Sequence, residues 1–431
     1  MPVTTATRQR CASCGQEFPD TDPHPRCPRC QGLLEVRHAA PPVTGAALRA
    51  LFDGRWGVRA GPHASGVWRF TEIVAPAASH EILTYPEGNT PLLARPAVSE
   101  WAGTAGLLLK HEGLNPTGSF KDRGMTVGVT QARRIGATAV ACASTGNTGA
   151  SLAAYAALAG LPALVVVPKG QVAVGKLAQA LAYGARTLVV RGNFDRCLEL
   201  VDEASRELGV YLLNSINPFR LEGQKTIVLE TLQQLGWEPP DWILVPAGNL
   251  GNTAAFGKAL TEAREWGLIA RLPRLAAIQA AGAAPFAASF RDGFKRRHRV
   301  EPHTVATAIN IGNPASHDRA ARAIQETGGV VTAVSDDEIL EAKAVVDAGG
   351  VGCEPASAAA VAGARQLVRE GVIRPADRVV AVLTGHLLKD PAAVTRYHAE
   401  TEPPPPRANR PVEIEPRLSE IERELRACQT T

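Results

Sequence analysis

The chain has 431 residues, 45% of them hydrophobic and 20% charged, which is typical of a globular protein of roughly two to three domains. Lys and Arg number 46 against 42 Asp and Glu, so the net charge is only +4. This small excess over a long chain argues against nucleic acid or a membrane surface as a partner. The first ten residues, MPVTTATRQR, contain no apolar signal-peptide segment, so we expect a cytoplasmic protein.

Two C-x-x-C pairs lie near the N-terminus, CASC and CPRC, with twelve residues between them. Four thiolates at this spacing suit a tetrahedral zinc ion, and a closed set of four leaves no open position for catalysis. So short a segment buries no core of its own, so we expect structural zinc to hold residues 1–38 together as a zinc-ribbon-like knuckle. An arm without metal, or with disulfides, is the alternative. The expected ligands are Cys11, Cys14, Cys27 and Cys30.

Residues 39 to about 79 are rich in Pro, Gly and Ala, which predicts a connector packed on a neighbouring domain. From about residue 107, short β-branched runs such as ALVVVPK alternate with amphipathic segments such as GKLAQALAYG. This alternation predicts βαβ units and parallel sheets covered by helices on both faces. An eight-stranded barrel is the weaker alternative, because the strands are uneven and long inserts interrupt them.

The segment from Thr148 to Val167 is uncharged and long enough to cross a membrane. Gly160 and Pro162 divide it into an Ala-rich part and a β-branched part, so we expect a buried helix followed by a strand.

The alternating pattern stops past Pro391. The run EPPPPR at residues 402–407 predicts a stiff, extended linker, and residues 414–427 predict one charged helix. We therefore expect a catalytic region over residues 39–395 and a Pro-rich tail over residues 396–431. Within the catalytic region, the expected large domain covers about 39–115 and 225–395, and the small domain about 116–224.

Four predicted strand ends carry polar loops, and ligands of parallel α/β sheets bind at such ends. The loops are NPTGSFKDRG at 115–124, STGNTG at 144–149, AGNLGNT at 247–253 and TGH at 384–386. The loop at 247–253 suits a phosphate, because its glycines let backbone N–H groups converge at a helix N-terminus. It lacks the G-x-G-x-x-G spacing of a dinucleotide site.

Lys121 lies between a Gly/Ser-rich turn and the predicted start of a helix. A lysine that forms a Schiff base needs a fixed position and a neutral amine, whereas a solvated surface lysine needs no such setting. A lysine loop, an Asn/Thr-rich turn and a phosphate turn together describe a site for pyridoxal phosphate, an aldehyde cofactor with a phosphate group.

The ordered motifs resemble the second fold type of pyridoxal-phosphate enzymes, and within it the threonine synthase family. The resemblance runs from about residue 85 to 391, and the cysteine pattern resembles an extension found on some members. It implies two parallel-sheet α/β domains with the active site between them, and a homodimer. The motifs are GNTPL (88–92), NPTGSFKDRGM (115–125), STGNT (144–148), GKLAQA (175–180), NSINPFRLEGQKT (214–226), PAGNLGNT (246–253), EPASAA (354–359) and LTGHLLKD (383–390).

The resemblance also implies roles for individual residues. Lys121 corresponds to the catalytic Schiff-base lysine, Asn147 to the partner of the cofactor's phenolic oxygen, and Thr384 to the hydroxyl facing the pyridine nitrogen. The loop that binds the cofactor phosphate corresponds to Gly248, Asn249, Leu250, Gly251 and Asn252. The residues near the substrate carboxylate correspond to Ser144 and Thr145. Those that bind the substrate phosphate correspond to Asn214, Ser215 and Arg220, with Asn249 adjoining.

The family resemblance implies conversion of O-phospho-L-homoserine and water to L-threonine and phosphate. A threonine or serine dehydratase is one alternative, although those enzymes typically carry a His where Thr148 stands and a GGGG-like phosphate turn. A cysteate-synthase-like enzyme, in which another nucleophile replaces water, is a second. A zinc-ribbon-bearing scaffold on a decayed enzyme is a third, and intact Lys121, Asn147 and Thr384 argue against it.

Overall fold

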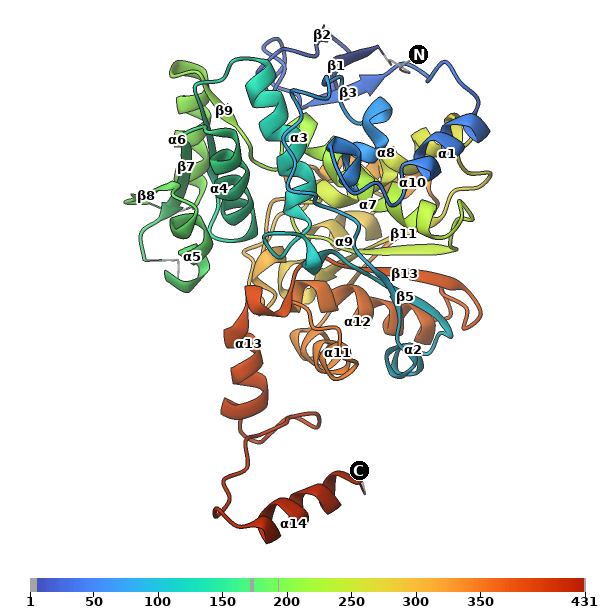
Figure 1. Ribbon diagram of the computed structural model, residues 1–431, viewed down its shortest axis with the longest axis vertical. Helices are drawn as coiled ribbons and strands as arrows, with labels where there is room; N and C mark the ends of the chain where they lie inside the picture. The colour runs from blue at the N-terminus through green and yellow to red at the C-terminus, as the bar shows by residue number, and fades with distance from the viewer. Residues whose placement is uncertain (1–5, 171–173, 193, 430–431) are drawn as a thin grey trace. The chain divides into compact units, whose positions relative to one another are not determined.

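The computed structural model describes residues 6–170, 174–192 and 194–429. It forms two compact units, Met1–Asp390 and Pro391–Thr431. The first unit holds three sheets (Figure 1), a small antiparallel one at the N-terminus and two larger ones that are mostly parallel.

The N-terminal sheet has the strand order β2-β1-β3, and both pairings are antiparallel. Its strands are β1 (Thr7–Cys11), β2 (Glu17–Pro19) and β3 (Leu34–His38). Val36 of β3 belongs to the largest hydrophobic core of the first unit. The backbone carbonyl of Asp20 accepts a hydrogen bond from Gln131 at 2.7 Å, and its carboxylate pairs with Arg134 at 3.0 Å. The knuckle therefore packs on the catalytic region as well as holding the four cysteines.

The large sheet has the strand order β12-β11-β10-β13-β5-β4. All its pairings are parallel except that between β4 and β5. Its strands are β4 (Leu92–Ala94), β5 (Gly106–His111), β10 (Trp242–Pro246), β11 (Arg274–Ala280), β12 (Val330–Val334) and β13 (Arg378–Leu383).

Alternate residues of the central strands enter different cores, because successive side chains of a strand point to opposite faces. On β10, Ile243 and Val245 belong to one core, and Trp242 and Leu244 to the other. The first core also contains residues of α1 (Gly45–Gly54), α7 (Pro218–Gln234), α8 (Gly251–Glu265), α9 (Pro285–Arg291) and α10 (His317–Glu326). The second contains residues of α2 (Pro96–Ala102), α11 (Asp336–Ala348) and α12 (Pro355–Arg369).

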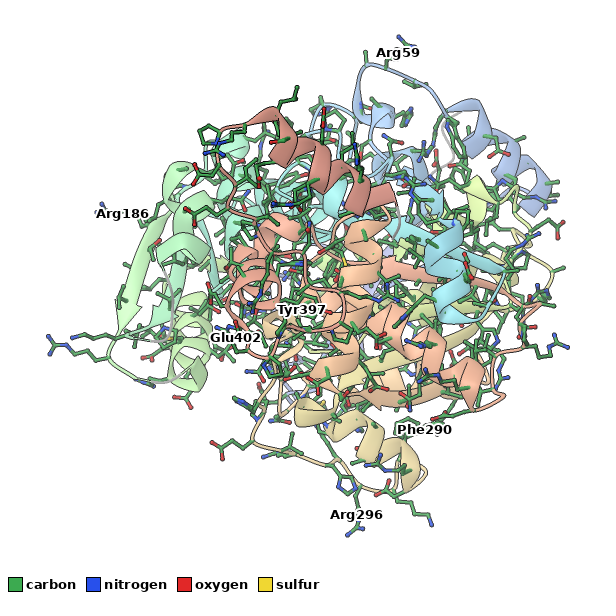
Figure 2. The ribbon with its side chains drawn as sticks, turned by 90° about the horizontal axis from the view of Figure 1, so that it is seen from below. Arg59, Arg186, Phe290, Arg296, Tyr397 and Glu402 are labelled. Atoms are coloured by element: carbon green, nitrogen blue, oxygen red, sulfur yellow. The ribbon has the colours of Figure 1, made fainter. Side chains whose placement is uncertain are left out.

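The small sheet has the strand order β8-β7-β6-β9, all parallel. Its strands are β6 (Ala139–Ala143), β7 (Ala163–Pro168), β8 (Arg186–Val190) and β9 (Val210–Leu212). Its helices are α3 (Lys121–Arg134), α4 (Asn147–Ala159), α5 (Val174–Ala182) and α6 (Phe194–Glu207). β8 is an edge strand, and Figure 2 shows Arg186 projecting away from it.

Short 3₁₀ segments connect the main elements. They are η1 (Pro62–Ala64), η2 (Trp68–Ile73), η3 (Glu112–Leu114), η4 (Ala281–Ala283), η5 (Thr307–Ile309) and η6 (Leu387–Lys389). The second unit contains α13 (Pro391–Thr395), the π-helical segment η7 (Arg396–Glu400) and α14 (Leu418–Gln429). α14 starts four residues later than the helix predicted from residue 414.

The predicted alternation of strands and helices is confirmed, and the barrel alternative is wrong because the strands form two open sheets. The uncharged segment is α4 followed by β7, separated at Gly160, which ends the helix with a φ of 65°. Within the described ranges, no helix is both long and apolar enough to span a bilayer. Sequence patterns missed β4, whose three residues follow a proline, and α1 inside the predicted connector.

Helices α3 and α7 cross with no side chain between their backbones. A Cβ atom on Gly223 would lie 1.8 Å from the carbonyl oxygen of Arg123 and 2.9 Å from the Cα atom of Gly124. Only glycine is tolerated at this position, because a side chain would force the helices apart. α3 begins with Lys121 and α7 carries Arg220, so the crossing sets the distance between two predicted site residues.

Buried ion pairs lie beside this crossing. Glu230 of α7 accepts hydrogen bonds from Lys110 at 2.6 Å, Arg123 at 2.8 Å and Arg69 at 3.0 Å. Glu112 pairs with Arg123 at 2.6 Å. Burial raises the pKa of Glu230, but Arg123 and Lys110 more than offset it, so the pKa lies well below its usual range. The cluster joins β5, η2, α3 and α7 by charge-assisted hydrogen bonds.

We expect Glu230→Gln to lower the free energy of unfolding by about 3–5 kcal/mol, because it leaves three cations facing one remaining carboxylate. Urea denaturation followed by circular dichroism measures the loss. The matched control is Glu199→Gln, which removes an exposed ion pair with Arg196 and is expected to cost less than about 1 kcal/mol. Equal losses for the two variants would contradict the assigned role of Glu230.

Candidate functional site

A cavity of about 780 Å³ opens between the two parallel sheets. Its walls come from the carboxyl ends of β5, β6, β9, β10 and β13. Because parallel strands present their carboxyl ends at one edge, residues far apart in sequence meet here. All predicted site residues of the catalytic region line this cavity except Arg220: Lys121, Ser144, Thr145, Asn147, Asn214, Ser215, Gly248, Asn249, Leu250, Gly251, Asn252 and Thr384.

The lysine loop is held by its own hydrogen bonds and by β13. The carboxylate of Asp122 accepts hydrogen bonds from the backbone N–H of Thr117 at 2.7 Å and from its hydroxyl at 2.6 Å. Gly118, with a φ of 86°, allows the turn that precedes the helix. The N–H of Phe120 donates to the carbonyl of Thr384 at 3.0 Å. Lys121 is the first residue of α3, as the sequence predicts.

The environment of Lys121 favours a neutral amine. Burial and the nearby Arg220 guanidinium lower the pKa of Lys121 to about 7, against a smaller opposing effect of Glu354. The ammonium position lies 3.9 Å from the centre of the Phe120 ring. At neutral pH, a large share of the Lys121 side chains therefore carries a free electron pair, which nucleophilic and general-base chemistry requires.

The loop after β6 leads into α4 and presents small polar groups to the cavity. The hydroxyl of Ser144 accepts from the N–H groups of Gly146 at 3.3 Å and Gly149 at 3.2 Å. Thr145 and Asn147 also line the cavity. The loop therefore offers hydroxyl and amide groups, and no charge, to a ligand.

The loop after β10 has the geometry of a phosphate cradle. Leu250 has a φ of 64°, which turns the chain into α8, and no side chain caps the helix. A Cβ atom on Gly248 would lie 2.9 Å from the Cα atom of Ile309, so the backbone passes close to η5. Among the described residues, the side-chain oxygen of buried Asn252 has no hydrogen-bond partner. Free N–H groups at a helix N-terminus suit an anion.

Glu354 is a site residue for which the sequence motifs predicted no role. Its buried carboxylate accepts hydrogen bonds from the amide of Asn147 at 3.0 Å and the hydroxyl of Thr384 at 3.3 Å. Burial raises the pKa of Glu354, against the opposing effects of Asn147 and Lys121. The motif EPASAA contained the signal, a carboxylate directly before a helix, but its contact with both residues exists only in the fold.

Lys389 is a second residue missed by sequence reasoning. It lines the cavity and donates to the carbonyl of Thr117 at 3.1 Å and to the side chain of Gln179. Burial lowers the pKa of Lys389. Lys389 therefore connects η6, which follows the large sheet, to the lysine loop and to α5 of the small sheet.

The predicted substrate-phosphate residues occupy two layers. The amide of Asn214 exchanges two hydrogen bonds of 3.0 Å with the backbone of Ala143, and Ser215 accepts from the amide of Asn249 at 2.6 Å. Arg220 is buried behind the wall, donates to the carbonyl of Leu213 at 2.9 Å, and does not line the cavity. Among the described residues, its Nε atom has no hydrogen-bond partner. Asn217 caps the N-terminus of α7 and accepts from the N–H of Arg220 at 3.1 Å.

The four N-terminal cysteines lie apart from the cavity and close to one another. All their sulfur atoms lie within 4.8 Å, with 3.4 Å between Cys11 and Cys30 and 3.8 Å between Cys14 and Cys27. A tetrahedral zinc site with metal–sulfur distances of about 2.3 Å has sulfur atoms about 3.8 Å apart. The donor set and the spacing therefore both fit zinc.

Residues 83–385 match the pyridoxal-phosphate dependent enzyme family, and the chain belongs to that family. The cavity fits the cofactor, because it brings a lysine with a lowered pKa to the same site as an uncapped helix N-terminus, which suits an anion. The most similar relatives named below are threonine synthases, which is a narrower class than the family. The chain is 45% identical to the threonine synthase of Methanocaldococcus jannaschii over 397 residues, covering 91% of this chain and 95% of that one.

Other relatives agree with this assignment. The chain is 49% identical to the threonine synthase of Synechocystis sp. over 312 residues, covering 72% of this chain and 79% of the relative. Threonine synthase from Escherichia coli shares the fold with a TM-score of 0.70 at 18% identity, covering 96% of this chain and 94% of that one. A threonine deaminase from T.th. aligns at 28% identity with a TM-score of 0.57, covering 69% of this chain and 92% of that one.

We expect cofactor-free protein to capture pyridoxal 5'-phosphate at a rate that rises with pH through about 7, because only neutral Lys121 attacks the aldehyde. Stopped-flow absorbance measures the rate at each pH. Arg220→Met removes a neighbouring positive charge, so it should raise the pKa of Lys121 and shift the profile to higher pH. A wild-type midpoint near 10 would contradict the lowered pKa.

Proposed function

We propose that this chain is a pyridoxal-phosphate-dependent lyase that converts O-phospho-L-homoserine and water to L-threonine and phosphate, the reaction of threonine synthases. The observation that carries the proposal is the cavity itself. It combines Lys121, an anion-binding helix N-terminus and further hydroxyl and amide groups at the strand ends. Full-length identity of 45% to a threonine synthase supports the substrate class.

In this proposal, the cofactor is held by Lys121, Asn147, Thr384 and the loop Gly248–Asn252. When bound, pyridoxal phosphate withdraws electrons from bonds at the substrate α carbon. The hydroxyl oxygen of Thr384 lies 2.9 Å from the hydroxyl of Ser357 and 3.3 Å from a carboxylate oxygen of Glu354, so hydrogen bonds to two residues hold its position. A hydroxyl facing the pyridine nitrogen does not enforce protonation as a carboxylate would.

The two anionic ends of the substrate are assigned to separate groups. Ser144 and Thr145 bind the carboxylate. Asn214, Ser215 and Asn249 line the cavity and bind the phosphate. Arg220, whose guanidinium lies behind the cavity wall, contributes its positive charge from there.

Lys121 is the proton carrier of the reaction. With a pKa of about 7, it can both accept and return protons near neutral pH, at the substrate α and β carbons. The γ-phosphate leaves with the electrons of its C–O bond, a proton removed from the β carbon is balanced by one added at the γ carbon, which becomes the methyl group, and water adds at the β carbon.

A dehydratase acting on threonine or serine remains the second candidate, and a cysteate-synthase-like enzyme the third. The 28% identity to a threonine deaminase favours the dehydratase reading as the runner-up. Its chain aligns with only 69% of this one, whereas the Methanocaldococcus jannaschii threonine synthase aligns with 91%.

Zinc at Cys11, Cys14, Cys27 and Cys30, a homodimeric assembly and a cytoplasmic location belong to the same proposal. The sulfur geometry supports zinc as a structural ion. The domain boundaries at residues 38 and 395 also remain part of it.

We expect the purified, cofactor-loaded protein to release phosphate and threonine in equal amounts from O-phosphohomoserine. Lys121→Ala should keep the fold and lose turnover, because the proton carrier is gone. A malachite-green assay and amino-acid chromatography measure the products. Ammonia and a 2-oxo acid from threonine or serine, without phosphate release from phosphohomoserine, would favour the dehydratase.

Treatment with a strong chelator should release one zinc ion per chain and make residues 6–38 sensitive to protease. Cofactor absorbance should persist, because none of the cavity residues comes from the knuckle. Metal analysis of a reductively purified sample, followed by limited proteolysis, checks both parts. Protein without zinc would exclude the metal site, and cofactor loss in step with zinc loss would exclude an independent cofactor pocket.

A further inference from the structure

We propose that His38 of the knuckle is a positioning residue for Arg220, and that through Glu222 it fixes helix α7 and thereby the affinity of the active site for a phosphate group. The inference rests on the proposed function, which assigns Arg220 to the substrate phosphate.

His38 makes a buried contact between the knuckle and α7. Its side chain is 1% exposed, and Nε2 lies 2.9 Å from a carboxylate oxygen of Glu222. Nδ1 lies 2.9 Å from the hydroxyl of Thr7. Burial and the nearby Lys225 lower the pKa of His38, so the ring is neutral at pH 7. The neutral ring donates from Nε2 to Glu222 and accepts from Thr7 at Nδ1.

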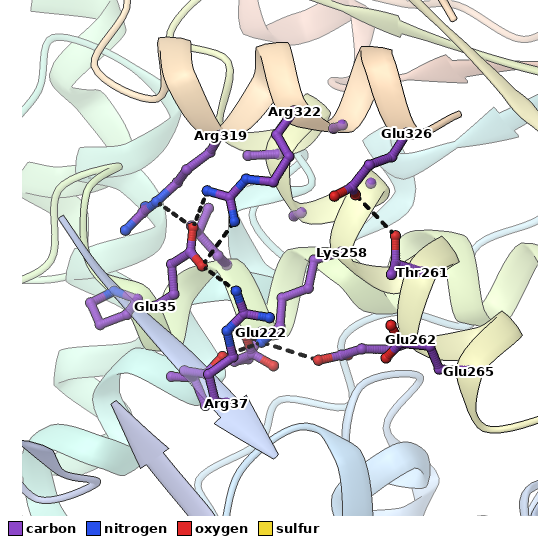
Figure 3. Close-up of a pocket in the computed structure, with 17 residues that line it drawn as sticks. Glu35, Arg37, Glu222, Lys258, Thr261, Glu262, Glu265, Arg319, Arg322 and Glu326 are labelled. Carbon is purple, nitrogen blue, oxygen red and sulfur yellow. Dashed lines mark hydrogen bonds and ion pairs between the residues drawn. The ribbon is translucent and has the colours of Figure 1, made fainter. Parts of the chain in front are cut away.

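Glu222 is the centre of a buried cluster of charges. It pairs with Lys225 at 2.5 Å and with Lys258 of α8. Lys258 also donates to the carbonyl of Val36 on β3 at 2.7 Å, and Lys225 pairs with Glu262 at 2.7 Å. Figure 3 shows Lys258 extending toward Glu222 and the knuckle strand. The cluster therefore ties β3 to α7 and α8 together.

Arg220 and Glu222 lie on different faces of α7. Residues two apart in an α-helix are separated by about 200° around the axis. Arg220 faces α3, where a Cβ atom on Gly128 would lie 3.2 Å from its Cγ atom, and Gln224 lines the active-site cavity. Glu222 faces the knuckle. A rotation of α7 that moves one of these side chains must move the other.

The close crossing of α3 and α7 at Gly223 makes the contact between His38 and Glu222 important for the position of α7. Gly223 and Gly124 meet without side chains, so the crossing holds α7 close to α3 but supplies no interlocking side chains at that point. Glu230 anchors α7 two turns further on, beyond the residues that face the cavity. In the N-terminal half of α7, the carboxylate of Glu222 makes buried polar contacts with residues of other elements, namely His38 and Lys258.

A second contact joins the knuckle to α10 and does not involve α7. Glu35 of β3 pairs with Arg322 at 3.1 Å and Arg319 at 3.4 Å, both on α10. Figure 3 shows Glu35 between these arginines at a cavity of about 190 Å³. Breaking the Arg322 pair loosens the knuckle without touching Glu222, and Arg322→Met is therefore a matched control.

The test compares four variants of the full-length, cofactor-loaded protein. His38→Leu removes the donor to Glu222. His38→Gln restores it, because a glutamine amide reaches roughly the position of Nε2. Arg322→Met is the docking control, and Arg220→Ala gives the loss of phosphate affinity when the Arg220 charge is absent. Each is measured for KM and kcat with O-phosphohomoserine, cofactor affinity by absorbance, melting temperature, and binding of inorganic phosphate by calorimetry.

We expect His38→Leu to raise KM and weaken phosphate binding about three- to tenfold with cofactor affinity unchanged, and Arg220→Ala to weaken phosphate binding at least tenfold. His38→Gln and Arg322→Met should resemble the wild type. The proposal is overturned if His38→Leu binds phosphate normally, if it loses cofactor affinity to the same degree, or if Arg322→Met matches it.

Failure of this proposal and failure of the proposed function give different results. Wild-type protein that releases no phosphate from phosphohomoserine disproves the function, while the phosphate calorimetry still decides whether His38 acts on Arg220. If the wild type shows no measurable phosphate binding, the proposed effect of His38 on phosphate affinity is overturned.

Discussion

The close crossing of α3 and α7 is the constraint on which the site depends. With Gly223 against the backbone of Arg123, the two helices approach until only backbone atoms separate them. The crossing brings Arg220 close enough to lower the pKa of Lys121, together with burial. The ion pairs of Arg123 with Glu230 and Glu112 then hold the same helices from the side. A larger residue at the crossing would separate the lysine from its charged neighbour and loosen the ion cluster.

The site combines few charges with much hydrogen bonding. The loops after β6 and β10 offer hydroxyls, amides and backbone N–H groups, while the buried ionisable groups have shifted pKa values. Burial raises the pKa of Glu354 and lowers the pKa of Lys121. Both shifts favour the neutral form, because the charged form loses solvation when protein atoms replace the water around it. The pKa of Lys121 near 7 results from this environment, because a lysine in water has a much higher pKa.

The knuckle has two physical roles that the structure separates. Four cysteine sulfur atoms within 4.8 Å have a geometry that fits a metal ion, in a short segment whose own hydrophobic cluster is small. The strand β3 then packs Val36 into the main core and places His38 on Glu222. The knuckle therefore contacts α7 from outside while contributing no group to the cavity.

Sequence reasoning determined the alternating architecture, the start of α3 at Lys121, the polar loops at strand ends and the cysteine spacing. These are local: side-chain periodicity, glycine turns and ligand intervals are properties of short segments. It could not find Glu354, Lys389 or His38 as participants, because a carboxylate, an amine or an imidazole is unremarkable until the fold buries it beside a partner. It also expected Arg220 at the ligand, whereas the guanidinium lies behind the cavity wall. The tertiary structure decided these points, since burial and distances between residues nearly two hundred positions apart, such as His38 and Glu222, arise only when the segments pack.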